Sequence, residues 1–303
     1  MSVAPGSLPE TPAARRYRIV HETEYRYAWP ADSAWQLAHL RPRPTPRQQL
    51  LSHRLRVEPE PAECADDLDY FGNPVQRFAV PMVHERLLVR SDAEVAVRAP
   101  ARVGPSTAWE EPVLALRRAG PERRWELAQF VQASPHVPLL AAAAALARPL
   151  FSPGRDLRRA LLGLALRIQE EFRFDPQATQ VGTPLAEVLA ARRGVCQDFA
   201  HLMVAALRAL GLPARYVSGY LLTDPPPGQP RLVGADASHA WVSVWCGEAG
   251  WVDIDPTNGR FVDQAFVTLA WGRDYGDVAP LRGVVRGGGC QRLDVRVTVT
   301  PAP

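Results

Sequence analysis

The amino-acid sequence predicts an α+β protein: an N-terminal antiparallel β-domain, then a core in which a helix packs on an antiparallel sheet. Short β-leaning stretches, separated by Pro, Gly, Asn and Asp, fill residues 16–100. Apolar residues then recur at helical spacing from about Trp109 to Ala191. Strand patterns return after residue 214, which places the helices between two groups of strands.

The composition argues against two classes of partner. The chain has 303 residues, 35 basic and 32 acidic side chains, and a net charge of +3. This near balance leaves no basic footprint for nucleic acid. The longest uncharged apolar run, residues 137–147, is too short to cross a bilayer, and the first 16 residues lack the apolar segment of a signal peptide. We therefore expect a cytoplasmic protein with no nucleic-acid or membrane partner.

The chain divides into five predicted regions. Residues 1–15, rich in Pro, Ala and Ser, are expected to form a disordered tail. The β-domain spans residues 16–100 and includes the stretches YRIVHETEYRYA, HRLRVEP, RFAVPMV, RLLVR and AEVAVRA. Residues 101–155 form a linker and a helical segment, and residues 156–280 form the catalytic core. Residues 281–303 follow as a Gly-rich turn and a last strand.

The core opens with an amphipathic helix over residues 156–172. A second helix, starting near Phe199, is stopped by Gly211-Leu212-Pro213. A proline-rich loop over residues 224–230 is placed to cover a cleft. Strands are expected at residues 215–222, 239–245 and 251–255. One face of the first helix carries Leu157, Leu161, Leu164, Ala165 and Ile168.

The most informative segment is RGVCQDF, in which Cys196 follows a glycine at the start of a helix. The free N–H groups and the dipole of a helix N-terminus stabilise a thiolate, the nucleophilic form of cysteine. A small buried apolar residue is the commoner role of cysteine, so this segment alone leaves both interpretations open. The other cysteines, Cys64, Cys246 and Cys290, lack the spacing of a zinc knuckle or a disulfide framework.

A base and an orienting carboxylate are found on two consecutive strands. His239 opens the strand 239–245, and Asp255 closes the strand 251–255. If these strands form a hairpin that turns around residue 247, positions 239 and 255 lie opposite each other, within hydrogen-bonding reach. A Cys-His-Asp triad needs this arrangement. Asp253, on the same strand face as Asp255, is the alternative third member.

Together these segments resemble the transglutaminase-like superfamily, whose papain-like core supplies a cysteine at a helix start and a histidine and an aspartate on adjacent strands. The resemblance extends over residues 17–301 to the bacterial transglutaminase-like family. Its members carry an N-terminal β-domain and are designated cysteine proteases. It implies that Cys196 is the nucleophile, His239 the general base and Asp255 the orienting carboxylate. The matching stretches are HETEYRYAWPA, LRPRP, FGNPV, RRGVCQDFAHLMVAALRALGLPARYVSGYL, GADASHAWVSVW, GWVDIDPTN and WGRDYGDVAPLRGVVRGGG.

One departure from the family and four further residues concern the surroundings of the triad. After DPTN the family usually carries an acidic residue followed by His-Ile, whereas this chain has QAFV at residues 264–267. We therefore expect an intact triad with one altered substrate contact. Asp198 and His201 share a helix face and fit structural roles as well as substrate contacts. Candidates for substrate, oxyanion or supporting roles are Gln197, Asp198, His201 and Trp241, the last as a wall of the cleft.

The function predicted from these residues is cysteine-dependent processing of an amide through a thioester acyl-enzyme, with a peptide or protein substrate and no cofactor. The Cys196 backbone N–H is the expected oxyanion donor. Hydrolysis, as in a peptidase or amidase, is favoured over amine transfer, as in a true transglutaminase. Three less favoured functions are an arylamine N-acetyltransferase, a non-catalytic peptide-binding module on a papain-like core, and a zinc site. The zinc ligands would be Cys196, His201, His239 and Asp255.

Overall fold

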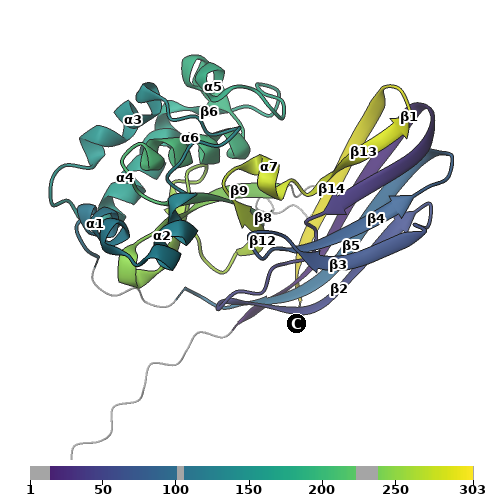
Figure 1. The fold of residues 1–303 in the computed structure, drawn as a ribbon, viewed down its shortest axis with the longest axis horizontal. Coiled ribbons are helices and arrows are strands. Elements are labelled where there is room, and N and C mark those ends of the chain that lie inside the picture. The colour runs from purple at the N-terminus through teal and green to yellow at the C-terminus, as the bar shows by residue number, and fades with distance from the viewer. Residues whose placement is uncertain (1–13, 101–105, 223–237, 303) are drawn as a thin grey trace, which may run out of the picture.

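The fold is taken from a computed structural model that describes residues 14–100, 106–222 and 238–302. Nearly all of the predicted tail, the middle of the linker and the predicted loop 224–230 lie outside the described residues. The described chain forms two antiparallel sheets, and the helices gather around one of them (Figure 1). No helix in the described part is long and apolar enough to span a membrane.

The N-terminal sheet is built around one long strand, β1 (Arg15–Ala38). The first half of β1 pairs with β5 and β14, and its second half pairs with β4 and β13, so both edges are occupied. Residues 281–303, expected as a separate region with a Gly-rich turn and one strand, instead supply two strands that complete the sheet that residues 16–100 begin. The other strands are β2 (Gln48–Glu58), β3 (Glu63–Leu68), β4 (Pro74–Val80), β5 (His84–Val97), β13 (Leu281–Gly287) and β14 (Gln291–Ala302).

The second sheet lies within the region predicted as the core, residues 156–280, and has the strand order β11-β10-β9-β8-β12. Every residue of β8 is buried, which is typical of a strand covered on both faces. A two-stranded parallel pair, β6 with β7, lies beside the helices. The bounds are β6 (Arg173–Phe174), β7 (Arg193–Gly194), β8 (Ala214–Leu221), β9 (Ser238–Trp245), β10 (Trp251–Asp255), β11 (Arg260–Phe261) and β12 (Phe266–Gly272).

The helices match the predicted pattern. Helix α4 (Leu157–Glu171) is capped by Asp156, which accepts a hydrogen bond from the Arg159 backbone N–H, and its buried face contains all the predicted residues. Helix α6 (Cys196–Arg208) is buried from its third residue to its last, so it runs through the interior. The other helices are α1 (Glu110–Arg118), α2 (Pro121–Ala128), α3 (Ala141–Ala147), α5 (Leu185–Ala191) and α7 (Tyr275–Val278), with 3₁₀ turns at Arg148–Leu150 and Gly247–Ala249.

The β9–β10 hairpin forms, but its register differs from the expected one by two residues. Trp251 pairs with Trp245, and Ile254 pairs with Val242, so the hairpin turns around residue 248. The turn is centred one residue later than expected, because Gly247 and Gly250 both adopt positive φ around a 3₁₀ turn. A shift of two residues keeps each side chain on its predicted face. His239 and Asp255 are therefore diagonal neighbours rather than directly opposite.

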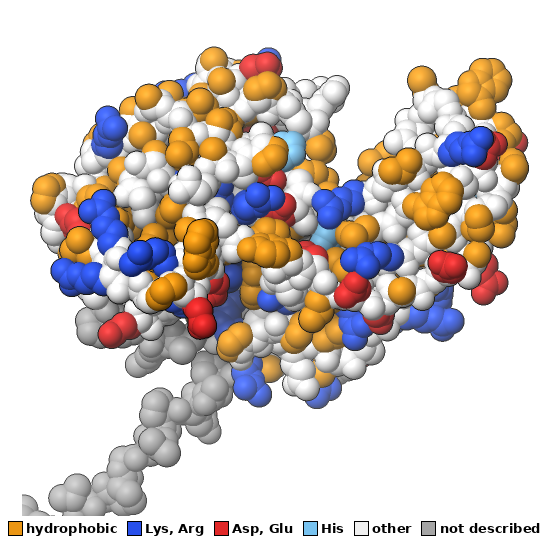
Figure 2. Space-filling model, in the orientation of Figure 1, with side chains coloured by type: hydrophobic (Ala, Val, Ile, Leu, Met, Phe, Trp, Pro, Cys, Tyr) orange, Lys and Arg blue, Asp and Glu red, His pale blue; other side chains and the backbone are white. Residues whose placement is uncertain are grey.

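The two sheets are joined by a shared core and by polar contacts. Tyr17 and Ile19 of β1 belong to the same hydrophobic cluster as α4 and α6. His21 Nδ1 lies 2.9 Å from the Tyr220 hydroxyl of β8, and the Tyr17 hydroxyl donates to the Gln264 carbonyl at 2.9 Å. Above this junction, a notch separates the helical lobe from the N-terminal sheet (Figure 2).

The LRPRP and FGNPV segments supply much of this junction. The Arg43 guanidinium lies over the Trp271 ring, 3.6 Å from its centroid, and donates to the Asn73 side chain at 2.7 Å. Asn73, fully buried, also bonds the backbone N–H and the carbonyl of Trp271 in β12. These two segments of the β-domain thus hold β12, an outer strand of the second sheet.

Candidate active site

Three predicted residues come together where α6 begins and where β9 begins and β10 ends. His239 Nε2 donates to Asp255 Oδ2 at 2.8 Å, and the Cys196 side chain lies close enough to the imidazole to raise its pKa. Because Nε2 serves the carboxylate, Nδ1 is the ring nitrogen left for the sulfur. Cys196 is half-buried and Asp255 fully buried, so the series runs from the surface inward. This is the arrangement of nucleophile, base and orienting carboxylate that the sequence predicts.

The electrostatics favour a charged histidine. Burial lowers the pKa of His239, but hydrogen bonds and charge interactions with Asp255 and Cys196 outweigh it and raise the pKa to about 9. Burial likewise works to raise the pKa of Asp255, and the bonds from His239, Asn258 and Thr257 hold it below its ordinary value. At neutral pH the pair is therefore an imidazolium beside a carboxylate.

The residues after Asp255 anchor it, and the triad spacing alone did not predict this role. Asp255 Oδ1 accepts the Thr257 backbone N–H at 2.8 Å, and Oδ2 accepts the Asn258 side-chain amide at 2.6 Å. Both carboxylate oxygens are thus held by hydrogen bonds other than the one that joins Oδ2 to the imidazole. The signal was present in the DPTN stretch, since Asx-type turns are typical of such a sequence.

The start of α6 is fixed by Asp198, which acts as a structural cap. Its Oδ2 accepts the Val195 backbone N–H at 2.8 Å and the Thr179 hydroxyl at 2.6 Å. A Cβ on Gly194 would lie 2.7 Å from the same oxygen, so glycine is required there. Of the two roles open for Asp198, the structure favours the structural one, because the carboxylate is buried and its partners belong to the protein.

His201 also has a structural environment. It is buried, its Nε2 accepts the Tyr275 backbone N–H at 3.1 Å, and its ring stacks on His136 with the centroids 5.7 Å apart. Burial lowers its pKa to about 3, so the ring is neutral. His201 therefore ties α6 to the family-like segment at α7. Among the described residues, no three His, Cys, Asp or Glu side chains form a group that could hold a metal ion.

Aromatic rings back the histidine. Trp241 is fully buried and its ring centroid lies 6.3 Å from that of His239, while Phe266 lies 6.0 Å from His239 and 5.4 Å from Trp241. Phe266 belongs to the stretch that departs from the family pattern. A Cβ on Gly219 would meet the Trp241 ring at 2.4 Å, so this glycine makes room for the tryptophan. Trp241 thus supports His239 from the sheet.

The remaining candidates separate clearly. Gln197 is half-exposed beside Cys196 and stays a candidate for substrate contact. Asp253 lies away from His239 and lines a different cavity, with Arg215. Cys246 is buried, and burial raises its pKa to about 12, while burial and Asp66 raise the pKa of Cys64.

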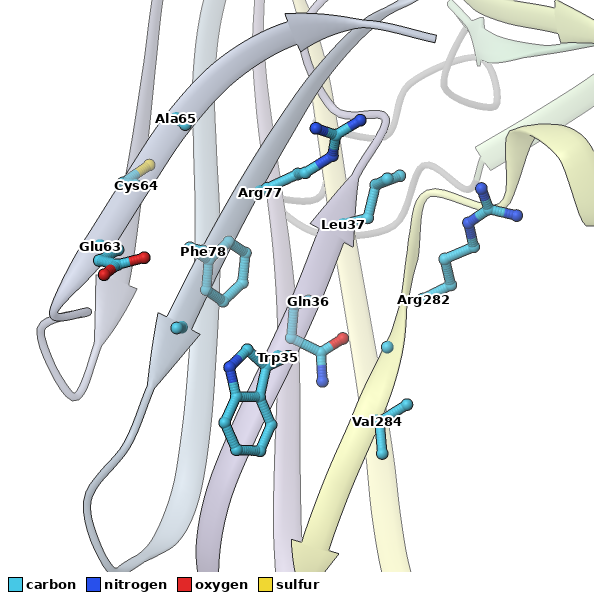
Figure 3. A pocket seen from close by; sticks show the side chains of 12 residues that line it. Trp35, Gln36, Leu37, Glu63, Cys64, Ala65, Arg77, Phe78, Arg282 and Val284 are labelled. Carbon is cyan, nitrogen blue, oxygen red and sulfur yellow. The ribbon is translucent and has the colours of Figure 1, made fainter. Parts of the chain in front are cut away.

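A separate groove of about 680 Å³ lies on the N-terminal sheet (Figure 3). Trp35 and Val284 pair across β1 and β13 on its floor, beside the pairs that Leu37 makes with Arg77 and Arg282. Trp35 is 52% exposed and Val284 69%. No triad residue lines this groove.

Comparison with known families gives two matches along the chain. Residues 17–96 match the bacterial transglutaminase-like N-terminal region, and residues 144–256 match the transglutaminase-like superfamily. The second match contains all three triad residues. The first covers most of the N-terminal sheet but not β13 and β14.

Whole-length relatives occur in mycobacteria. An uncharacterised protein of Mycobacterium tuberculosis is 41% identical over 304 residues, covering 97% of this chain and 95% of the relative. Another, from Mycobacterium leprae, is 33% identical over 288 residues, covering 94% and 98%. A protein-glutamine gamma-glutamyltransferase of Pseudomonas aeruginosa is 33% identical over 119 residues, which is 37% of this chain and 18% of that protein.

A solved structure shares the fold. A candidate cysteine protease from Cytophaga hutchinsonii superposes with a TM-score of 0.75 at 21% identity, over 96% of this chain and 91% of that one. Because the superposition spans nearly the whole chain, it includes both sheets and the helices that surround the second one.

Proposed function

The chain belongs to the transglutaminase-like superfamily, with a bacterial transglutaminase-like N-terminal region, and from this we propose that it is a cysteine-dependent amide-processing enzyme. The observation that carries the proposal is the series Cys196, His239 and Asp255, in which the buried carboxylate is hydrogen-bonded to the imidazole and the cysteine side chain lies beside it. The substrate class is a peptide or protein amide.

The proposed reaction begins with attack of the Cys196 thiolate on the amide carbonyl carbon. The negative charge moves to the carbonyl oxygen, which the Cys196 backbone N–H stabilises at the start of α6. The His239 imidazolium gives its Nδ1 proton to the leaving amine, the C–N bond breaks, and a thioester remains. Asp255 keeps the ring oriented and stabilises its charge throughout.

Hydrolysis of the thioester by water is the favoured second step. A primary amine with a pKa near 10.4 is almost entirely protonated at neutral pH, so aminolysis dominates only where a site excludes water and binds the amine. No triad-supporting residue described above is an acidic group free to capture a cation. Transglutamination is the second candidate, and the name of the Pseudomonas aeruginosa relative favours it.

The test is a product analysis with a glutamine-containing peptide. We expect ammonia release and the glutamate product, with only a minor fraction of conjugate when millimolar primary amine is added. The chain has no lysine, so it offers no ε-amine for self-modification and the background is clean. Cys196→Ala is the control and should release no ammonia. Predominant conjugate at neutral pH would replace the hydrolase assignment with transglutaminase, and inactivity on a peptide-amide panel would reject both.

A further inference from the structure

A second cavity, of about 750 Å³, lies at the end of the catalytic sheet away from His239. Asp253 of β10 lines it, and its pairing partner Ser243 is four residues along β9 from His239, about 13 Å in an extended strand. Its walls also come from β8, from β12 and from the segment before β2. None of the triad residues lines it.

Arg215 at the start of β8 is the central feature of this cavity. Its side chain is 8% exposed, and its guanidinium lies between two indole rings, 3.7 Å from the centroid of Trp271 and 4.1 Å from that of Trp251. Stacking fixes the plane of the guanidinium but uses none of its N–H groups. Within the described residues the Arg215 side chain has no hydrogen bond or ion pair, and its buried Nε has no partner. Buried cations in proteins are ordinarily paired with an anion, so the unpaired guanidinium of Arg215 indicates a place where an anion binds.

The other charged groups of the cavity leave a positive excess. Arg123 donates to Glu126 at 2.7 Å, so these two neutralise each other. Among the described residues, the Arg47 side chain donates only to the Asp263 carbonyl oxygen, and Arg158 faces the Phe261 ring at 5.5 Å without an ion pair.

Asp253 is the opposing charge. It works to raise the pKa of Arg215, yet burial prevails and the pKa falls to about 9. Apart from the Arg123–Glu126 pair, the charged side chains that line the cavity are therefore one carboxylate, Asp253, and three arginines: Arg47, Arg158 and Arg215.

We propose that the cavity binds a small organic anion through a carboxylate or phosphate group. The N–H groups of Arg215 and Arg158 hold the anionic oxygens, which the guanidinium fork matches in geometry. The indole edges of Trp251 and Trp271 and the Phe261 ring contact the apolar body of the ligand. A cavity of this size suits a small molecule. This site is independent of the proposed amide chemistry.

The test is calorimetric titration of the full-length Cys196→Ala variant with phenyl phosphate, with benzoate and with uncharged benzamide. At least one anion should bind with a Kd of about 1 mM or tighter, and benzamide should not bind. Tighter binding of phenyl phosphate than of benzoate identifies a phosphate ligand, and the reverse order identifies a carboxylate. Because Trp251 and Trp271 flank Arg215, binding should also change the tryptophan fluorescence.

Variants decide where the anion binds. Arg158→Gln should weaken binding at least tenfold, while Arg159→Gln, the exposed neighbour outside the cavity, should leave the Kd unchanged. Arg215→Gln should abolish binding if circular dichroism shows a folded protein, and Arg158→Gln decides the matter if it does not. The proposal is overturned if neither anion binds, or if Arg158→Gln binds like the parent. It is also overturned if Arg159→Gln weakens binding equally, which indicates general surface attraction.

Discussion

At the residue scale, the environment of Cys196 separates it from the other three cysteines. Its neighbour His239 is positively charged at neutral pH, whereas the pKa of Cys64 and that of Cys246 are raised by burial. We expect iodoacetamide at neutral pH to label Cys196 first, as read by peptide mass spectrometry. His239→Gln should slow this labelling and leave that of exposed Cys290 unchanged. Preferential labelling of any other cysteine, with Cys196 inert, would rule out the triad.

A second prediction at this scale separates the two aspartates of β10. Asp255→Asn should lower kcat by orders of magnitude, because the carboxylate orients the imidazole and stabilises its charge. Asp253→Asn, the matched control on the same strand face, should change kcat less than about threefold, because Asp253 does not reach the imidazole. The reverse ranking would assign the third role to Asp253.

The pH dependence follows from His239. Its raised pKa means that the imidazolium persists up to about pH 9, so kcat/KM should fall as the pH rises through that value. In Asp255→Asn the alkaline fall of the residual kcat/KM should shift to lower pH, because the variant lacks the carboxylate that raises the pKa of His239. A pH profile of initial rates measures both effects, and an alkaline limb that stays fixed in the variant would contradict this origin.

At the element scale, the position of the nucleophile depends on how α6 starts. Gly194→Ala brings a methyl group to 2.7 Å from the capping oxygen of Asp198 and so displaces the first turn. We expect kcat/KM to fall at least tenfold and the free energy of unfolding by about 1–2 kcal/mol, the usual effect of a lost cap. Gly120→Ala is the control, because nothing lies within 4 Å of its added methyl group. Equal kinetics in the two variants would show that the cap does not position Cys196.

The hairpin shows what periodicity can and cannot determine. Alternation along β9 and β10 correctly predicted that His239 and Asp255 share a face, because a strand has a period of two. The pairing register depends on loop conformation, and the positive φ of Gly247 and Gly250 cannot be read from alternation. The hydrogen bonds to Asp255 from Thr257 and Asn258 were not predicted either, because they depend on the conformation of the turn after β10 and alternation within the strand does not report it.

At the scale of the whole molecule, the contacts between the sheets explain why the β-domain accompanies the core. Asn73→Ala removes the hydrogen bonds to Trp271 and the acceptor of Arg43, leaving buried groups unpaired. The free energy of unfolding should fall by roughly 2–3 kcal/mol in urea titrations. Leu68→Ala, at a residue that is 63% exposed on β3, should cost under about 0.5 kcal/mol. Similar losses in both variants would show that Asn73 does not hold the sheets together.

The sequence predicted the class of each half of the molecule, and the joining of the halves required three-dimensional information. Strand patterns identified residues 16–100 as a β-domain, but pairing between Arg16 and Ala302 spans nearly the whole chain and leaves no local signal. The Arg215 stack was missed for the same reason, because Trp251 and Trp271 are remote from it in sequence and converge only in the folded sheet.

The central position of β1 has a consequence for synthesis. One edge of this 24-residue strand is filled by β13 and β14, whose residues are translated long after β1 has left the ribosome. Until then its N–H and C=O groups along that edge are open to pairing with other chains, as in any exposed edge strand. Synthesis must therefore reach the end of β14, at Ala302, before this edge of β1 can be closed within the chain.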